Sequence, residues 1–114
     1  MPAVAWVTVI IAVLIIAITA VGLLRVVLHL PDSGSLKSKR QVVSGLLKRL
    51  RQQHHVAAAE VGELDRWQLA ELAVATVSAS GRHADEVLAA VLSYVESHSD
   101  GARITDVSTE LIRV

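Results

Sequence analysis

The chain has 114 residues, which is enough for one domain but not for two. Cysteine is absent, and this excludes a disulfide framework and thiolate chemistry. The net charge of zero conceals a division, because residues 25–55 carry a charge of +6 and residues 56–114 carry −6. Such a division favours a polarised surface whose positive side can bind phosphates, unless the two halves neutralise each other across the fold.

Residues 1–20 form an apolar segment, and no charged residue occurs before Arg25. A run of this length can span a membrane as a helix, for which about 20 apolar residues suffice. The basic residues that follow would then hold the rest of the chain at the inner, cytoplasmic face of the membrane. Two alternatives stay open: the segment is an extension that is not translated, with the true start near Val21, or it is an unusually long apolar strand.

The first elements of the domain are a strand, a turn and a helix. A strand is predicted over residues 21–30, because Leu24, Val26, Leu28 and Leu30 alternate with Arg25, Val27 and His29 in the period-two pattern of a half-buried strand. Residues 31–35 read Pro-Asp-Ser-Gly-Ser, which has the composition of a turn. A helix is predicted from Leu36 to Gln53, with Ser35 as its N-cap. Its apolar side chains fall on one arc, formed by Val42, Val43, Leu46, Leu47 and Leu50.

The second half of the domain supplies three strands and another helix. Residues 56–61 are predicted to form a short strand that is rich in alanine, and residues 69–78 form a longer strand with alternating faces. An amphipathic helix follows the loop at 79–82, and Asp100-Gly101 is expected to end it. Residues 103–112 are predicted to form the last strand.

Two helices that each bury one apolar stripe need a common sheet face. The order βαββαβ therefore predicts an α+β fold, a ferredoxin-like sandwich in which two helices lie on one face of a four-stranded antiparallel sheet. The domain is expected over residues 21–114, preceded by the apolar N-terminal segment. The other sheet face stays open, and its small residues Ala73 and Ala75 would let a second sheet approach closely.

Several short residue blocks follow one another in a specific order. They are Gly22-Leu23-Leu24-Arg25-Val26, Leu28-His29-Leu30-Pro31, Ser35-Leu36-Lys37-Ser38-Lys39-Arg40, Leu47-Lys48-Arg49-Leu50-Arg51, Ala59-Glu60-Val61 and Trp67-Gln68. Together they resemble the signature of the YlxP-like bacterial family, a domain of unknown function. The resemblance covers residues 21–114 and implies a ferredoxin-like domain without an established reaction. Genes of this family often lie near those for translation initiation and ribosome maturation factors.

Basic residues of the first helix are the candidate functional site. Four of them cluster on an arc about 80° wide that is separate from the apolar arc, and a fifth, Lys39, lies near the preceding turn. Cations arranged in this way can bind a phosphate backbone with salt-sensitive affinity. The predicted nucleic-acid-binding residues are Lys37, Lys39, Arg40, Lys48 and Arg51. The alternative is a solvated helix face whose long side chains cover the edge of the core.

Three further groups of residues are candidate sites. His29, Arg25 and Glu60 would form a polar cluster if the first and second strands bring them together. A histidine paired with a carboxylate can serve acid-base chemistry, but an ion pair that fixes the strand ends is the simpler role. The adjacent histidines at 54 and 55 would point about 100° apart on a helix, which makes a poor metal chelate. Trp67 is expected to be a core anchor, with a contact to a partner as the alternative.

These patterns favour a binding protein over an enzyme. No glycine-rich phosphate loop, nucleophile or oxyanion site accompanies the histidines, so no catalytic residue, metal or cofactor is predicted. The leading hypothesis is a cytoplasmic, non-enzymatic accessory protein that binds RNA or the ribosome through the basic helix face. The second is a protein-interaction module that uses the open sheet face, also to form a homo-oligomer. Either would act at the inner face of the cell membrane if residues 1–20 anchor the chain.

Overall fold

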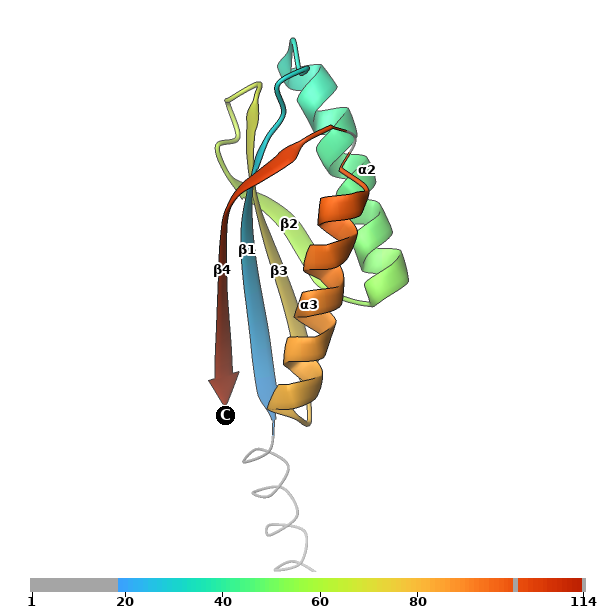
Figure 1. Cartoon of the computed structure of the whole chain (residues 1–114), viewed down its shortest axis with the longest axis vertical. Coiled ribbons are helices and arrows are strands. Elements are labelled where there is room, and N and C mark those ends of the chain that lie inside the picture. The colour runs from blue at the N-terminus through green and yellow to red at the C-terminus, as the bar shows by residue number, and fades with distance from the viewer. Residues whose placement is uncertain (1–18, 100, 114) are drawn as a thin grey trace, which may run out of the picture.

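The computed structural model describes residues 19–99 and 101–113. Their elements follow the order β1 (Ala20–His29), α2 (Leu36–His54), β2 (Ala57–Gly62), β3 (Leu69–Ser78), α3 (Gly81–Ser97) and β4 (Arg103–Arg113). The strands form one antiparallel sheet in the order β2-β3-β1-β4. The predicted ferredoxin-like α+β fold is confirmed, and both helices lie on one face of the sheet (Figure 1).

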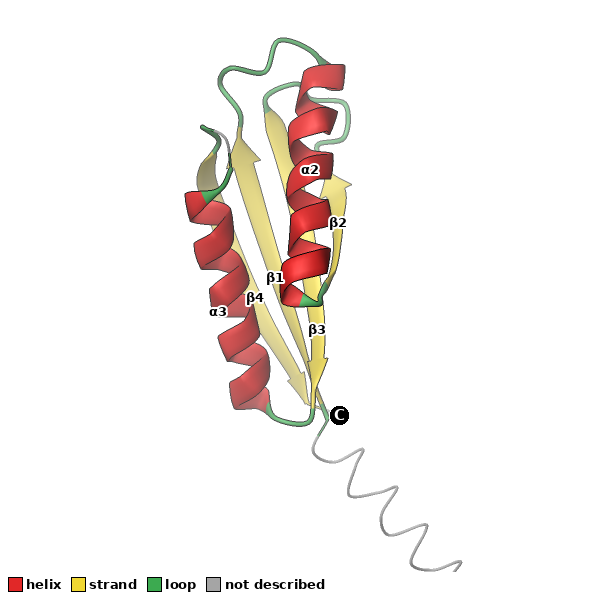
Figure 2. Ribbon diagram, turned by 90° about the vertical axis from the view of Figure 1, so that its right-hand side faces the viewer, coloured by secondary structure: helices red, strands yellow, loops and turns green. Residues whose placement is uncertain are grey.

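Alternation along the two central strands gives the sheet a buried face and an open face. On β1, Leu24, Val26 and Leu28 are each 1% exposed, whereas the residues between them are exposed or half-buried. Figure 2 shows α2 and α3 side by side in front of the buried face. The core between these layers is aliphatic, with Leu72 and Val74 from β3 packing against the helices.

A serine side chain caps the N-terminus of each helix. Ser35 Oγ accepts a hydrogen bond from the backbone N–H of Ser38 at 3.0 Å. Ser80 Oγ accepts one from the backbone N–H of His83 at 3.3 Å. Each cap supplies an acceptor to an N–H group that has no partner inside the helix, and this fixes where the turns before α2 and α3 end.

The two helices end in different ways. α2 ends before His55, whose φ of 53° is left-handed and interrupts the helical hydrogen-bond pattern. α3 ends at Ser97, and the N–H of His98 donates to the carbonyl of Tyr94 at 2.9 Å. Gly101, which was expected to end this helix, has a φ of 82° but lies in the turn that leads into β4. Its left-handed conformation turns the chain after the helix has already ended.

Helix α3 lies close to the backbone of β1. A methyl group on Gly22 would lie only 2.9 Å from Leu88 Cδ1, 3.2 Å from Thr76 Cγ2 and 3.4 Å from Ala84 Cβ. Glycine is therefore needed at this position because of close packing, and not because of an unusual backbone angle.

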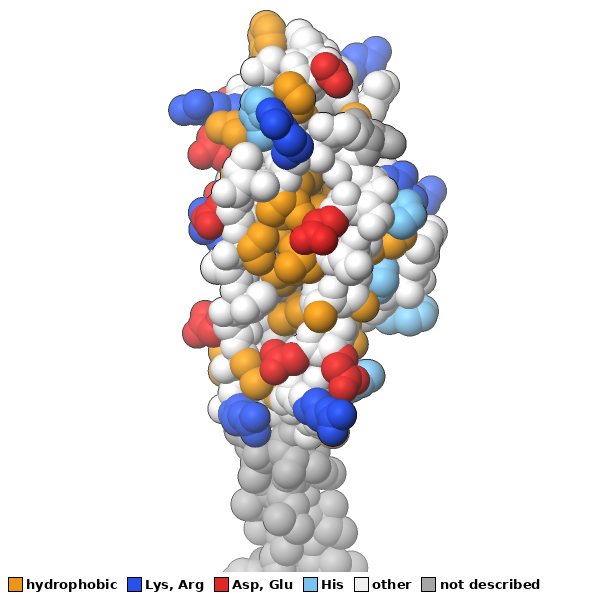
Figure 3. Space-filling view, in the orientation of Figure 1, with side chains coloured by type: hydrophobic (Ala, Val, Ile, Leu, Met, Phe, Trp, Pro, Cys, Tyr) orange, Lys and Arg blue, Asp and Glu red, His pale blue; other side chains and the backbone are white. Residues whose placement is uncertain are grey.

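The edge strand β4 is covered much less than β1. Val107 is opposite the buried Val26 in the register but is itself 38% exposed. Figure 3 shows hydrophobic side chains at the surface between β4 and α3. The two central strands therefore provide most of the sheet's share of the core.

Within residues 19–99 and 101–113, no helix is long and apolar enough to cross a membrane. The predicted apolar segment 1–20 lies outside the described residues except for Thr19 and Ala20, and Ala20 is the first residue of β1. A membrane anchor, an untranslated extension and a long apolar strand all remain predictions for residues 1–18.

Candidate functional site

The outer face of α2 carries four exposed cations, Lys37, Arg40, Lys48 and Arg51. They share an arc about 80° wide and extend along roughly 21 Å of the helix axis. No Asp or Glu occurs in α2. The ion pairs found among the described residues involve Arg25 and three other cations, and none includes a member of this set. Among the described residues, the acidic half of the chain therefore does not neutralise these four cations through ion pairs.

Arg51 differs from the other three cations. Its guanidinium donates hydrogen bonds to the carbonyl of Ala58, with the Nε atom 3.0 Å from that oxygen. This contact joins the last turn of α2 to β2, although the side chain remains exposed. Arg51 therefore has a structural role in addition to any role in binding.

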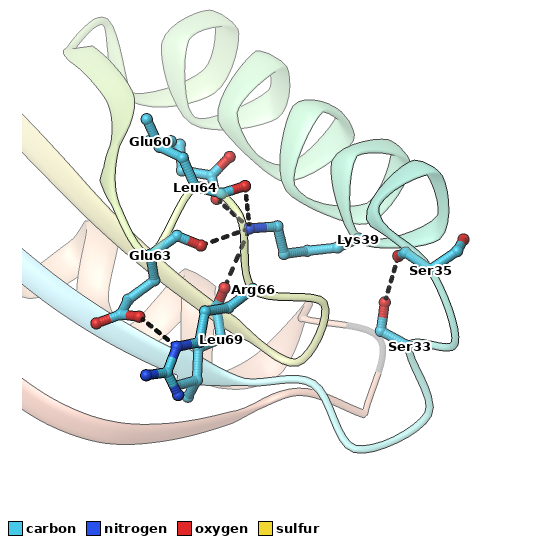
Figure 4. Close-up of polar contacts among 8 residues, drawn as sticks. All are labelled: Ser33, Ser35, Lys39, Glu60, Glu63, Leu64, Arg66 and Leu69. Atoms are coloured by element: carbon cyan, nitrogen blue, oxygen red, sulfur yellow. Dashed lines mark hydrogen bonds and ion pairs between the residues drawn. The ribbon is translucent and has the colours of Figure 1, made fainter.

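The prediction that Lys39 binds nucleic acid is wrong, because Lys39 is completely buried. Its Nζ atom lies 2.9 Å from Glu60 Oε2 and 2.9 Å from the carbonyl oxygen of Glu63. The carbonyl oxygens of Leu64 and Leu69 lie 3.2 Å away (Figure 4). Because Oε2 makes no hydrogen bond of good geometry, the contact with Glu60 is an ion pair rather than a directed hydrogen bond. An ammonium group enclosed in this way cannot reach a phosphate.

The sequence contained a sign of this burial. Lys39 precedes Val43, Leu46 and Leu50 by four, seven and eleven residues, the spacing of one helix face. All three of these apolar residues are buried. Lys39 therefore belongs to the core stripe of α2. Its charge suggested an exposed site, whereas its spacing from the apolar residues indicated burial.

Lys39 fixes the course of the loop between β2 and β3. The three carbonyls that it binds belong to residues 63, 64 and 69, so one side chain holds both ends of this loop. Hydrogen bonds also attach the segment to the end of β1: the N–H of Leu30 donates to the carbonyl of Gln68 at 2.8 Å, and Gln68 Nε2 donates to the carbonyl of Pro31 at 3.2 Å. The loop is consequently anchored through polar groups.

Trp67, which lies in this loop, is not the core anchor that was expected, since it is 54% exposed. The core is already filled by aliphatic side chains from the sheet and the helices. The predicted polar cluster of His29, Arg25 and Glu60 is also wrong. Glu60 lies on the buried face with Lys39, whereas Arg25 and His29 lie on the open face.

Arg25 forms a different cluster on the open face. It donates a hydrogen bond to Glu71 of β3, and its Nη1 atom lies 3.8 Å from Asp106 Oδ2 of β4. The hydrogen bond from Arg25, supported by its charge, lowers the pKa of Glu71. These contacts join the three strands across the middle of the open face.

His54 and His55 are not brought together as a chelate. His54 packs edge-on against Tyr94, with ring centroids 5.3 Å apart, and the ring of His98 stacks on that of Tyr94, with centroids 4.1 Å apart. His55 is the left-handed residue that follows α2. Among residues 19–99 and 101–113, no group of three or more His, Asp or Glu side chains is placed to hold a metal ion.

Comparison with known proteins identifies the family. The family model described as "Protein of unknown function (DUF503)" matches residues 21–109. The chain belongs to this family. It is also 36% identical over 66 residues to "Uncharacterized protein YlxP" of Bacillus subtilis (strain 168), a match that covers 58% of this chain and 72% of that protein.

The fold also resembles a solved structure, "De novo designed protein Foldit4". The TM-score is 0.50 at 10% sequence identity, and the match covers 82% of this chain and 96% of the designed one. At this identity the likeness shows the fold alone.

In this DUF503 domain, several blocks that carried the family resemblance meet at Lys39. Ser35 caps the helix that carries Lys39, Glu60 is the ion-pair partner, and Trp67-Gln68 lies in the loop whose carbonyls Lys39 binds. These blocks are distant in sequence, but they build one structural unit that presents Trp67 to solvent.

Proposed function

We propose that this DUF503 protein is a non-enzymatic accessory protein that binds RNA, free or in the ribosome, through the outer face of α2. The observation that carries the proposal is the set of exposed cations Lys37, Arg40, Lys48 and Arg51, which have no carboxylate partner among the described residues. We place the protein in the cytoplasm, at the inner membrane surface if residues 1–20 act as an anchor.

The physical basis is counterion release. A lysine or arginine that neutralises a phosphate frees a condensed cation, so the affinity falls as the salt concentration rises. For a single strand, the logarithm of the association constant falls by about 0.7 per contact for each unit of the logarithm of salt concentration. Internal ion pairs would reduce this gain, because a paired cation must first lose its carboxylate. Within residues 19–99 and 101–113, the outer face of α2 has no such pairs, whereas Arg25 on the open face is held by Glu71 and Asp106.

The test is RNA binding by the full-length chain at several salt concentrations, measured by fluorescence anisotropy. In the variant Lys37→Glu/Arg40→Glu/Lys48→Glu, we expect binding to be lost at moderate salt. In a second variant, Lys37→Gln/Arg40→Gln/Lys48→Gln, the three cations are neutralised without adding negative charge. The slope of log affinity against log salt concentration should then be less steep by about 2. Arg51 is left unchanged because it also holds Ala58.

Arg82 on α3 provides a control for net charge, since its side chain is 90% exposed and lies outside α2; unlike the α2 cations, it is paired with Glu86 at 3.2 Å. Lys48→Glu and Arg82→Glu change the net charge equally, but only the first should weaken binding. Equal effects of the two variants, or unchanged binding in the triple Glu variant, would refute the α2 interface.

A second candidate function is self-association through the open sheet face. Val21 of β1 is opposite Val77 of β3 and Ile112 of β4, and these two neighbours are 71% and 40% exposed. The result is an apolar row across three strands at one end of the open face. Light scattering of the wild-type chain and of Val77→Lys tests this candidate: a wild-type monomer, or an oligomer that persists in the variant, would exclude this row as the interface.

A further inference from the structure

Trp67 is an exposed aromatic residue in a loop whose backbone is fixed. Its side chain is 54% exposed, although tryptophan is largely buried in most proteins. The residues on both sides are anchored, because Lys39 binds the carbonyl of Leu69 and the carbonyl of Gln68 accepts from Leu30. The N–H of Arg66 also donates to the carbonyl of Glu63 at 3.0 Å. The indole is therefore presented by a preorganised support, which lowers the entropy lost when it binds a ligand.

An open depression of about 650 Å³ lies beside the indole. Its lining residues are His29, Asp65, Arg66, Trp67, Gln68 and Leu69. Arg103 of β4 is opposite His29 in the register and is exposed, so a second arginine lies next to this depression. The depression thus combines one aromatic plane with hydrogen-bonding groups, the carboxylate of Asp65 and two arginines. Arg66 is paired with Glu63 at 3.2 Å, whereas Arg103 has no ion pair among the described residues, so Arg103 is the cation open to a phosphate.

This chemistry matches an unpaired nucleobase and its phosphate. A base can stack on the indole, its edge can hydrogen-bond to imidazole, amide or carboxylate groups, and the adjoining phosphate can pair with an arginine. In double-stranded RNA the bases are already stacked and paired, so their faces are not available to Trp67.

We propose that Trp67 and the depression beside it form a base-stacking site for single-stranded RNA. The site rests on the proposed function, since it adds a base contact to the phosphate contacts of α2. The two surfaces are linked structurally: the β2–β3 loop and the first turns of α2 lie at the same end of the domain (Figure 1), and Lys39 connects them (Figure 4). RNA that binds both surfaces would be held by its backbone along α2 and by a base at Trp67.

The composition of the depression distinguishes this ligand from an apolar protein segment. Two other exposed apolar residues, Val61 at 50% and Leu64 at 52%, lie near Trp67 in the chain but do not line the depression. An apolar partner would be expected to use all three side chains as one hot spot. A base would use Trp67 without Leu64, and this difference provides a matched control.

The test compares a short single-stranded RNA oligonucleotide with the duplex that it forms with its complement, using full-length protein. Stacking on an aromatic side chain contributes about 1–3 kcal/mol per base, which is a factor of roughly 5 to 140 in affinity. We expect Trp67→Ala to weaken single-strand binding by such a factor and to leave duplex binding unchanged. Trp67→Phe, which keeps a ring, should retain most of the affinity, and Leu64→Ala should bind as the wild type does.

Fluorescence supplies a direct readout of the contact. The chain has two tryptophans, Trp6 and Trp67, so a Trp6→Phe background leaves Trp67 as the sole indole. Single-stranded RNA should quench this emission and the duplex should not. Unchanged single-strand affinity in Trp67→Ala would overturn the stacking site, as would equal losses in Trp67→Ala and Leu64→Ala. In both cases the α2 interface would stand if the Lys37→Glu/Arg40→Glu/Lys48→Glu variant still loses binding.

Discussion

Replacing Lys39 with methionine tests the most unusual feature of the core. Methionine keeps the length and apolar packing of the lysine stem but removes the ammonium group that lies 2.9 Å from Glu60 Oε2. The carbonyls of Glu63, Leu64 and Leu69 lose the same partner. Glu60 would then carry a charge without a counterion in a site where its side chain is only 15% exposed.

Removing one partner of a buried ion pair costs about 3–5 kcal/mol. The remaining exposure of Glu60 lets water reach the carboxylate, which places the expected loss for Lys39→Met near the lower limit, at about 3 kcal/mol. This is a large part of the free energy of unfolding of a small domain, which is typically about 5–15 kcal/mol. With a urea m-value of about 1–3 kcal/mol/M, the midpoint should fall by roughly 1–3 M.

Urea unfolding followed by circular dichroism measures this loss, and Lys37→Met is the control. Lys37 lies on the same helix but is exposed, so its replacement should change stability by no more than about 0.5 kcal/mol. The double variant Lys39→Met/Glu60→Leu should regain part of the loss, because it removes the unpaired charge. If Lys39→Met were no less stable than Lys37→Met, the buried position of Lys39 would be refuted.

Three smaller changes test the packing and the open face. Gly22→Ala should destabilise the domain by about 1–3 kcal/mol in thermal unfolding, since a methyl group would press on Leu88. Gly45→Ala should stabilise it by about 0.5–1 kcal/mol, because this glycine lies in the middle of α2 and a methyl group there would make only an ordinary 3.5 Å contact. The carboxyl of Glu71 should titrate by NMR below the ordinary glutamate range and return to it in Arg25→Gln. Because its folded pKa is lowered, the stability from this pair is present above the unfolded pKa and is lost as pH falls through the folded pKa; a wild-type Glu71 that titrates normally would contradict the contact.

The strands and helices could be predicted because their signals are local. Alternation over residues 69–78 gave the bounds of β3, and Ser35 was correctly recognised as the N-cap of α2. The end of α3 was placed too late because Gly101, a typical helix terminator, belongs to the next turn. The βαββαβ order then leaves few topologies, since both helices must cover the same sheet face.

The site was harder to predict, because the environment of a side chain depends on segments far apart in sequence. The sequence suggested a cluster of Glu60 with His29 and Arg25, but Glu60 lies on the opposite face of the sheet with Lys39. Successive residues of a strand point to opposite faces, so a difference of one residue in register decides which face a side chain occupies. Trp67 was assigned to the core by residue type. Its exposure depends on the course of a loop that is set by backbone carbonyls, and periodicity carries no information about these groups.

The buried lysine links the stability of the domain to the geometry of its proposed binding surface. An ion pair in a core is often no more stabilising than an apolar contact of the same size, so stability alone does not explain Lys39. Its ammonium group differs from any apolar side chain in binding several carbonyls at once, and those carbonyls belong to the loop that carries Trp67. An apolar residue at position 39 could fill the space but could not fix that loop. The lysine at this point of the core is therefore best explained by its role in fixing the position of Trp67 relative to the basic face of α2.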